Sequence, residues 1–274
     1  MVIIIAEIGE NHCGDMKIAK ELIDVAADAG CDYAKFQLYD AQDTSLDDPE
    51  REWFEKVQLD QDKLSMLAEH CHKKGIKPLC APWDKRKAEI IFRVGIEDMK
   101  IASFHIVDKE LLKFVNGKAK KVFMSTGMSD FDEIKEAVKL LSGTDLYLLH
   151  CVSEYPLPYE HVNLKVMDTL RSHFGNKVKP GYSDHTIGIF APIAAAARGA
   201  EVIEKHITLD KNMSGTDHIL SADPKELKEI VNGVRQVEKM LGAPEKILTS
   251  EEKKNQQFLR QRFSYGKKDN AARI

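Results

Sequence analysis

The sequence predicts a (β/α)₈ barrel. Short apolar runs alternate with longer helix-like segments eight times within roughly the first 240 residues, which is the order of elements in such a barrel. Polar side chains recur where the apolar runs end, and in a barrel these positions surround the mouth of the active site. The alternative is an open doubly wound sheet, but that fold needs a glycine-rich turn after its first strand, and none follows here.

The predicted strands are short and apolar, and the segments between them have helical features. We expect strands at 2–8, 32–37, 76–82, 98–103, 121–126, 146–151, 178–183 and 201–207. We expect helices at 17–29, 60–74, 85–94, 108–116, 130–142, 161–174, 188–199 and 224–241. In the first helix the apolar residues recur with the 3.6-residue period. Asp130 is a plausible N-cap of a later helix, and Gly30, Gly75, Gly95 and Gly199 follow helices as C-terminal glycines do.

Composition narrows the class of protein. A chain of 274 residues with 43% hydrophobic residues can bury a large core, and a net charge of −4 argues against nucleic-acid binding. No apolar run is long enough to span a membrane, and the first residues, MVIIIAEIG, lack the basic start of a signal peptide. The five cysteines are irregularly spaced, as in reduced proteins of the cytoplasm. We therefore expect a cytoplasmic protein that binds neither nucleic acid nor membranes.

Two histidines each close an apolar run. His185 lies within GYSDHT (181–186), and His206 lies within EVIEKHITLD (201–210), so both would lie at carboxyl ends of neighbouring strands. Adjacent strands are about 5 Å apart, so the two imidazoles could share one divalent metal with open positions for an oxygen substrate. The alternative is that both histidines cap buried strands and are hydrogen-bonded and inert.

Lysines and serines end several other predicted strands. Lys35, Lys100, Ser103 and Ser125 would form a cationic and hydroxyl cradle suited to a phosphate group. An unpaired buried ammonium is expensive, so each lysine within an apolar run needs a partner or a ligand. Glu7, inside VIIIAEIG, is either paired with a lysine or placed as a base beside a metal-bound water. Together these groups suit metal-assisted addition to a phosphorylated substrate.

These motifs resemble the sialic acid (N-acetylneuraminate) synthase family, whose enzymes condense phosphoenolpyruvate with a sugar aldehyde. The resemblance covers about residues 3–260 and is carried by AEIGENHCGD (6–15), KFQ (35–37), KIAS (100–103), STGM (125–128), LHCVSEYPLPYE (149–160), GYSDHT (181–186), IEKHITLD (203–210) and GTDH (215–218). It implies a barrel enzyme that releases phosphate and forms a 2-keto-3-deoxy sugar acid.

The resemblance also implies a role for each matching residue. His185 and His206 would bind Mn²⁺, with Mg²⁺ or Co²⁺ as alternatives, and Glu7 would act on the attacking water. Phosphoenolpyruvate would be held by Lys35, Lys100, Ser103, Ser125 and Ser183, with Ser153 where some members place asparagine. Gln37, Tyr155 and Asp217 would contact the sugar, and a homodimer is a possible assembly.

The chain departs from the family pattern at two positions near the cradle. His105 stands where family members usually carry an acidic residue, and it could bind an anionic substrate group or serve as an acid or base near neutral pH. The alternative is that it only fills space beside Trp83 or Phe104. Ala81 stands where the family has a threonine that helps to hold phosphoenolpyruvate. These departures leave open a related metal-dependent aldolase or lyase, or a barrel without catalytic activity that serves as a partner subunit.

The C-terminal segment differs from the barrel. We expect a barrel domain at 1–245 and a tail at 246–274 that resembles only the linker leading to the family's small antifreeze-like domain. In the family that domain supplies an arginine to the sugar, and Arg260, Arg262 or Arg273 could substitute for it here, in cis or from a neighbouring copy.

Overall fold

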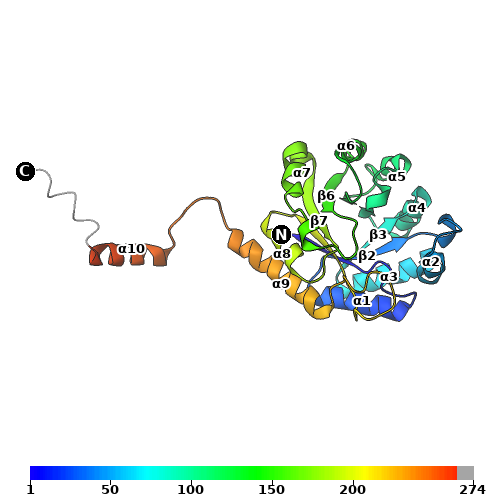
Figure 1. Ribbon diagram of the computed structural model, residues 1–274, viewed down its shortest axis with the longest axis horizontal. Helices are drawn as coiled ribbons and strands as arrows, with labels where there is room; N and C mark the ends of the chain where they lie inside the picture. The colour runs from blue at the N-terminus through cyan, green and yellow to red at the C-terminus, as the bar shows by residue number, and fades with distance from the viewer. Residues whose placement is uncertain (264–274) are drawn as a thin grey trace, which may run out of the picture. The chain divides into compact units, whose positions relative to one another are not determined.

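The computed structural model describes residues 1–263. Residues 1–240 form a closed barrel of parallel strands surrounded by helices (Figure 1). The strands follow one another around the barrel in sequence order, from β1 to β8 and back to β1. They are β1 (Ile3–Glu7), β2 (Tyr33–Leu38), β3 (Lys77–Pro82), β4 (Met99–Ile101), β5 (Lys121–Ser125), β6 (Asp145–Cys151), β7 (Lys179–Asp184) and β8 (Val202–His206). The predicted fold and all eight predicted strands are confirmed.

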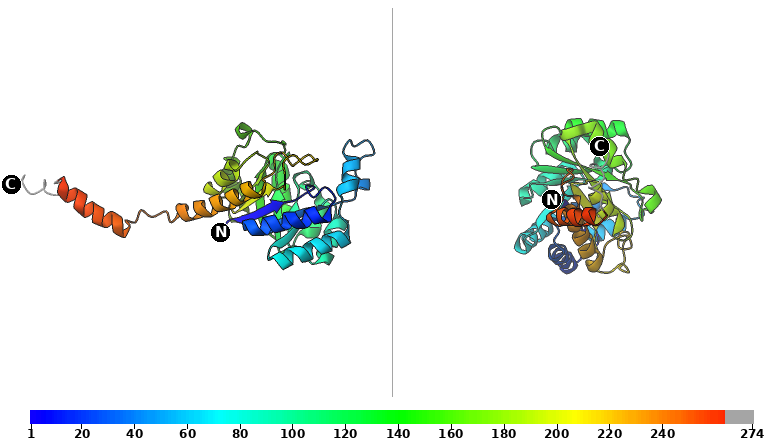
Figure 2. Two further views of the ribbon diagram at one scale, coloured as in Figure 1. Left: turned by 90° about the horizontal axis from the view of Figure 1, so that it is seen from below. Right: turned by 90° about the vertical axis from the view of Figure 1, so that its left-hand side faces the viewer.

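A helix follows each strand, as Figures 1 and 2 show. The helices of the barrel are α1 (Met16–Ala29), α2 (Arg51–Val57), α3 (Gln61–Lys74), α4 (Lys85–Val94), α5 (Lys109–Val115), α6 (Phe131–Leu140), α7 (Val166–Phe174), α8 (Phe190–Ala197) and α9 (Pro224–Leu241). Asp130 caps α6 by accepting hydrogen bonds from the amides of Asp132 and Glu133, as the sequence predicted. The short α2 was not predicted.

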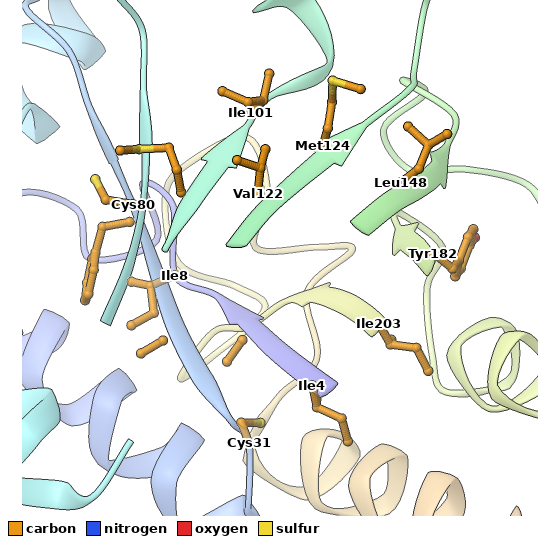
Figure 3. Packing of buried hydrophobic residues seen from close by; sticks show 14 of the residues in the cluster. Ile4, Ile8, Cys31, Cys80, Ile101, Val122, Met124, Leu148, Tyr182 and Ile203 are labelled. Atoms are coloured by element: carbon orange, nitrogen blue, oxygen red, sulfur yellow. The ribbon is translucent and has the colours of Figure 1, made fainter. Parts of the chain in front are cut away.

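Successive side chains along each strand point to opposite faces of the barrel wall, and this produces two clusters of buried apolar residues. The face toward the helices contributes Ile4, Tyr182 and Ile203 to a large apolar cluster, part of which is shown in Figure 3. The opposite face fills the barrel with Ile5, Tyr33, Leu79, Phe123, Tyr147, Leu149 and Val202. Because side chains alternate with a period of two, Glu7 after Ile5, Lys35 after Tyr33, and Glu204 after Val202 also face the interior. These charged side chains therefore lie directly above an apolar layer that fills the barrel interior.

The chain divides into two units, Met1–Met240 and Leu241–Ile274. The described part of the second unit contains α10 (Ser250–Arg262), which Thr249 and Glu252 cap with reciprocal hydrogen bonds. Arg260 and Arg262 lie in its last turn, whereas Arg273 lies outside the described residues. Within residues 1–263, every helix is too short or too polar to cross a lipid bilayer.

Candidate active site

A cavity of about 690 Å³ lies at the carboxyl ends of the strands. Among the residues that line it are Glu7, Lys35, Gln37, Lys100, Ser103, Ser125, Ser153, Tyr155, Ser183, His185, His206 and Asp217. Apart from His105, these are all the site residues that the sequence predicted. Side chains from distant segments therefore meet in one space, as the carboxyl-terminal face of a barrel allows.

Glu7 and Glu204 flank Lys35 in the floor of the cavity. Lys35 Nζ lies 3.1 Å from Glu7 Oε2 and 3.0 Å from Glu204 Oε2, and all three side chains are buried. The strand register brings them together, because Glu7 on β1 is opposite Lys35 on β2, and Glu204 on β8 is opposite Ile5, two residues before Glu7. Glu7 is thus paired with a lysine, one of the two arrangements that the sequence left open.

The second lysine forms a cradle with hydroxyl groups. Lys100 Nζ donates to Ser125 Oγ at 2.8 Å and lies 3.5 Å from Glu204 Oε1. Ser183 Oγ donates to the same carboxylate oxygen at 3.0 Å. Glu204 therefore joins both lysines and a serine, and it holds the donors of the cradle in place before any ligand binds.

Burial and charge shift the pKa values of these groups in different directions. Burial raises the pKa of Glu7, and the charge of Glu204 adds to this effect although Lys35 opposes it. Burial would lower the pKa of Lys35, but Glu204 and Glu7 raise it above the usual range. Burial lowers the pKa of Lys100, and the charge of Lys35 contributes. Burial would raise the pKa of Glu204, but Lys100 and Lys35 lower it, so Glu7 is the carboxylate in this cluster better suited to accept a proton.

Two glycines allow the chain to approach these groups closely. Gly9 has a φ of +50°, and a Cβ there would lie 2.9 Å from Glu7 Oε1. At Gly127 a Cβ would lie 2.3 Å from Ser153 Oγ and 2.9 Å from Ser103 Oγ. The Gly127 amide instead donates to Ser103 Oγ at 3.1 Å, which orients that hydroxyl. Both glycines thus shape the cavity floor beside the predicted site residues.

His185 and His206 lie side by side, with ring centroids 5.4 Å apart. His185 Nδ1 is 2.7 Å from the Val152 carbonyl, which can only accept, so this nitrogen carries the proton. His206 Nδ1 lies 3.2 Å from Asp217 Oδ2. Each ring therefore has Nε2 left for a ligand, with a carbonyl or carboxylate orienting its other nitrogen, as is common for metal-binding histidines.

These donors fit a divalent metal with open coordination positions. Two imidazoles that line one cavity suit Mn²⁺, Mg²⁺ or Co²⁺ only if water or substrate supplies further ligands. Within residues 1–263, no three His, Cys, Asp or Glu side chains converge to hold a metal by themselves. A metal bound here would therefore keep positions open for an oxygen substrate.

The residues expected to contact the sugar lie around this pair of histidines. The Tyr155 ring is 4.0 Å from the His185 ring, measured between centroids, and Asp217 lies beside His206. Gln37 donates to Glu7 Oε1 at 3.3 Å and accepts from Trp83 Nε1 at 3.1 Å. The Gln37 amide is therefore oriented by groups on both of its sides.

His105 differs from the other predicted residues, because it does not line the cavity. Its ring packs against Phe104, with centroids 4.4 Å apart, and lies 6.3 Å from the Trp83 ring. Burial lowers its pKa. These contacts favour the packing role over the role of an acid or base on the substrate.

Sequence reasoning missed several lining residues. Glu204 is one of them, because its position between two lysines depends on strand register. His150 hydrogen-bonds the Val162 carbonyl and does not pair with the adjacent Cys151. Cys151 nevertheless lines the cavity, 3.6 Å from Ser103 Oγ and 4.0 Å from His185 Nδ1. Because Cys151 ends a predicted strand, its position in the sequence already indicated that it could line the cavity.

Comparisons with known proteins identify relatives of this chain. The model of the NeuB family matches residues 22–246. The N,N'-diacetyllegionaminic acid synthase of Campylobacter jejuni is 40% identical over 278 residues, covering 94% of this chain and 83% of that protein. The human N-acetylneuraminate-9-phosphate synthase is 33% identical over 261 residues, covering 89% of this chain and 72% of that protein.

A solved structure has the same architecture. The crystal structure of N-acetylneuraminic acid (sialic acid) synthetase from Leptospira borgpetersenii, in complex with citrate, matches with a TM-score of 0.88 at 34% identity. The match covers 95% of this chain and 91% of that one.

Proposed function

The chain belongs to the NeuB family, and on that premise we propose that it condenses phosphoenolpyruvate with a sugar aldehyde to form a 2-keto-3-deoxy sugar acid. The observation that carries this proposal is the meeting of a lysine–serine cradle, a buried carboxylate and a histidine pair in one cavity. The names of the relatives support the same class of reaction, since they are synthases of nonulosonic acids.

The reaction forms one carbon–carbon bond and breaks one carbon–oxygen bond. C3 of phosphoenolpyruvate attacks the aldehyde carbon, and C2 becomes electron-poor and is captured by water. The C2–O bond to phosphate then breaks, which leaves a ketone and free phosphate. The two hydrogens of the water end on the new hydroxyl group and on the phosphate.

The chain supplies the groups that this sequence of steps needs. Lys35 and Lys100 hold the anionic groups of phosphoenolpyruvate, and Ser103, Ser125 and Ser183 add directional hydrogen bonds. Ser153, beside Gly127, lies next to the same group of hydroxyls. Glu7 takes the proton from the attacking water, a role supported by its burial and its raised pKa.

A divalent metal completes the proposed site. His185 and His206 would hold it, and when bound it would polarise the aldehyde oxygen so that a weak enol nucleophile can attack. Gln37, Tyr155 and Asp217 contact the sugar beside that oxygen. Mn²⁺ is the proposed metal, with Mg²⁺ and Co²⁺ as the alternatives to test.

The test measures phosphate release from phosphoenolpyruvate by the chelator-treated protein. Mn²⁺, Mg²⁺ or Co²⁺ is restored in the presence of N-acetylmannosamine, its 6-phosphate, or a diacetamido hexose. The last corresponds to N,N'-diacetyllegionaminic acid without its three pyruvate carbons. His185→Ala is compared with His72→Ala, which removes an exposed histidine on α3. Metal binding by each variant is measured separately by calorimetry.

The outcomes separate the competing functions. Metal-dependent release that needs an aldehyde and is lost only in His185→Ala supports the synthase. Binding of phosphoenolpyruvate without turnover of any aldehyde favours a non-catalytic barrel. Turnover of another keto acid favours a related aldolase or lyase, and no binding of phosphoenolpyruvate contradicts the cradle itself.

A further inference from the structure

The loops contribute a different lining to the cavity from that of the strands. Glu10, Glu50 and Asp217 line it from loops. The ring of Trp83, also on a loop, and the ring of Phe54, on α2, line it as well. Within residues 1–263 the lining contains two lysines, Lys35 and Lys100, both on strands, and no arginine. A dianionic phosphate is therefore matched by cations only on the strand side of the cavity. The loop side offers carboxylates and aromatic faces.

Glu10 is held rigidly in this loop region. Tyr39 Oη donates to its Oε1 at 2.9 Å, and Trp53 Nε1 donates to its Oε2 at 2.8 Å. Each carboxylate oxygen thus has one fixed donor and keeps lone pairs for a further donor from a ligand. Burial raises the pKa of Glu10 to about 7, and the nearby charges of Asp217 and Glu50 contribute.

We propose that Glu10, supported by Glu50 and Asp217, makes the enzyme select an unphosphorylated aldose and reject the corresponding sugar phosphate. This inference rests on the proposed function. Phosphoenolpyruvate occupies the lysines, so the far end of the acceptor meets the loop carboxylates. Hydroxyl or amide N–H groups there donate to Glu10, whereas a phosphate would face like charges, and no lysine or arginine among residues 1–263 lines that side of the cavity.

The test compares kcat/KM for N-acetylmannosamine and for its 6-phosphate with saturating phosphoenolpyruvate and Mn²⁺ at pH 8, where Glu10 is ionised. We expect the unphosphorylated sugar to be preferred. Glu10→Gln should reduce that preference by roughly five- to tenfold, which is the effect of one unit charge about 7 Å away in a partly solvated site. Glu50→Gln should act in the same direction more weakly, because Glu50 is exposed.

The matched control is Glu52→Gln, which removes an exposed carboxylate on α2 that does not line the cavity. It should leave the preference unchanged. Equal or better use of the 6-phosphate by the unmodified protein overturns the inference while leaving the proposed function intact. An unchanged preference in both Glu10→Gln and Glu50→Gln overturns the role of these carboxylates.

A binding measurement covers the case in which no acceptor reacts. Each sugar is then titrated into the protein saturated with phosphoenolpyruvate. Tighter binding of the unphosphorylated sugar, weakened selectively by Glu10→Gln, supports the inference although the proposed reaction has failed. Tighter binding of the phosphate, or no binding of either sugar, overturns it.

Discussion

Replacing Glu204 with glutamine should destabilise the protein strongly when no ligand is bound. Glu204 lies 3.0 Å from Lys35 Nζ and 3.5 Å from Lys100 Nζ, and it accepts a hydrogen bond from Ser183. At an effective dielectric constant near 20, each attraction is about 5 kcal/mol before desolvation is subtracted. Removing one partner of a buried ion pair has a net cost of about 3–5 kcal/mol, because an uncompensated charge is left behind.

Thermal unfolding of Glu204→Gln and of the unmodified protein measures this cost. For a domain of this size about 1 kcal/mol corresponds to roughly 2–4 °C, so the midpoint should fall by roughly 10 °C. Phosphoenolpyruvate should raise the midpoint more in Glu204→Gln than in the unmodified protein, because its anionic groups replace the missing charge between the lysines. Glu201→Gln is the matched control, since Glu201 is exposed just before the same strand.

The loss of stability caused by Glu204→Gln should also depend on pH. Burial would raise the pKa of Glu204, but Lys100 and Lys35 hold it below its ordinary value of 4.5. Its stabilising contribution is therefore complete above about pH 4.5 and is lost as the pH falls below that value. The free energies of unfolding of Glu204→Gln and of the unmodified protein should differ most at pH 7, and the difference should shrink in acid. A loss below about 1 kcal/mol at pH 7 would refute the network as described.

Further predictions concern single groups in the cavity. Glu7→Gln should lower kcat by about 10²–10⁴-fold while phosphoenolpyruvate still binds, as shown by steady-state kinetics and calorimetry; retained turnover would exclude Glu7 as the base. Ala81→Thr should add a hydrogen bond to phosphoenolpyruvate and lower its KM by roughly two- to tenfold in steady-state kinetics. An unchanged KM would show that the threonine side chain does not reach the ligand. Glu10→Gln should be more stable than the unmodified protein at pH 8 and equally stable near pH 4.5. The pKa of Glu10 is raised to about 7 in the folded state, so ionisation costs the folded protein stability as the pH rises from about 4.5 to 7. Urea unfolding at the two pH values measures this, and a difference that does not change with pH would contradict it.

Much of the fold and of the candidate site follows from local patterns. Strand and helix lengths are visible in the sequence because each periodicity is set by the backbone of its own segment. His185 and His206 each close an apolar run, and parallel neighbouring strands necessarily end at the same edge. The period of two likewise places Glu7 and Lys35 on the inward face, above Ile5 and Tyr33. The sequence by itself therefore determined the barrel and most of the residues that line its mouth.

Only the tertiary structure decided how these residues are paired. Glu204 joins Lys35 and Lys100 because closure of the barrel sets β8 beside β1 and across from β4, which no local pattern encodes. Glu10 is held by Tyr39, which follows β2, and by Trp53 on α2, and their positions beside Glu10 depend on packing between distant segments. The ring of His105 packs against Phe104 and lies 6.3 Å from the ring of Trp83, which follows a different strand. Periodicity specifies which face a residue occupies, whereas long-range packing specifies its partners.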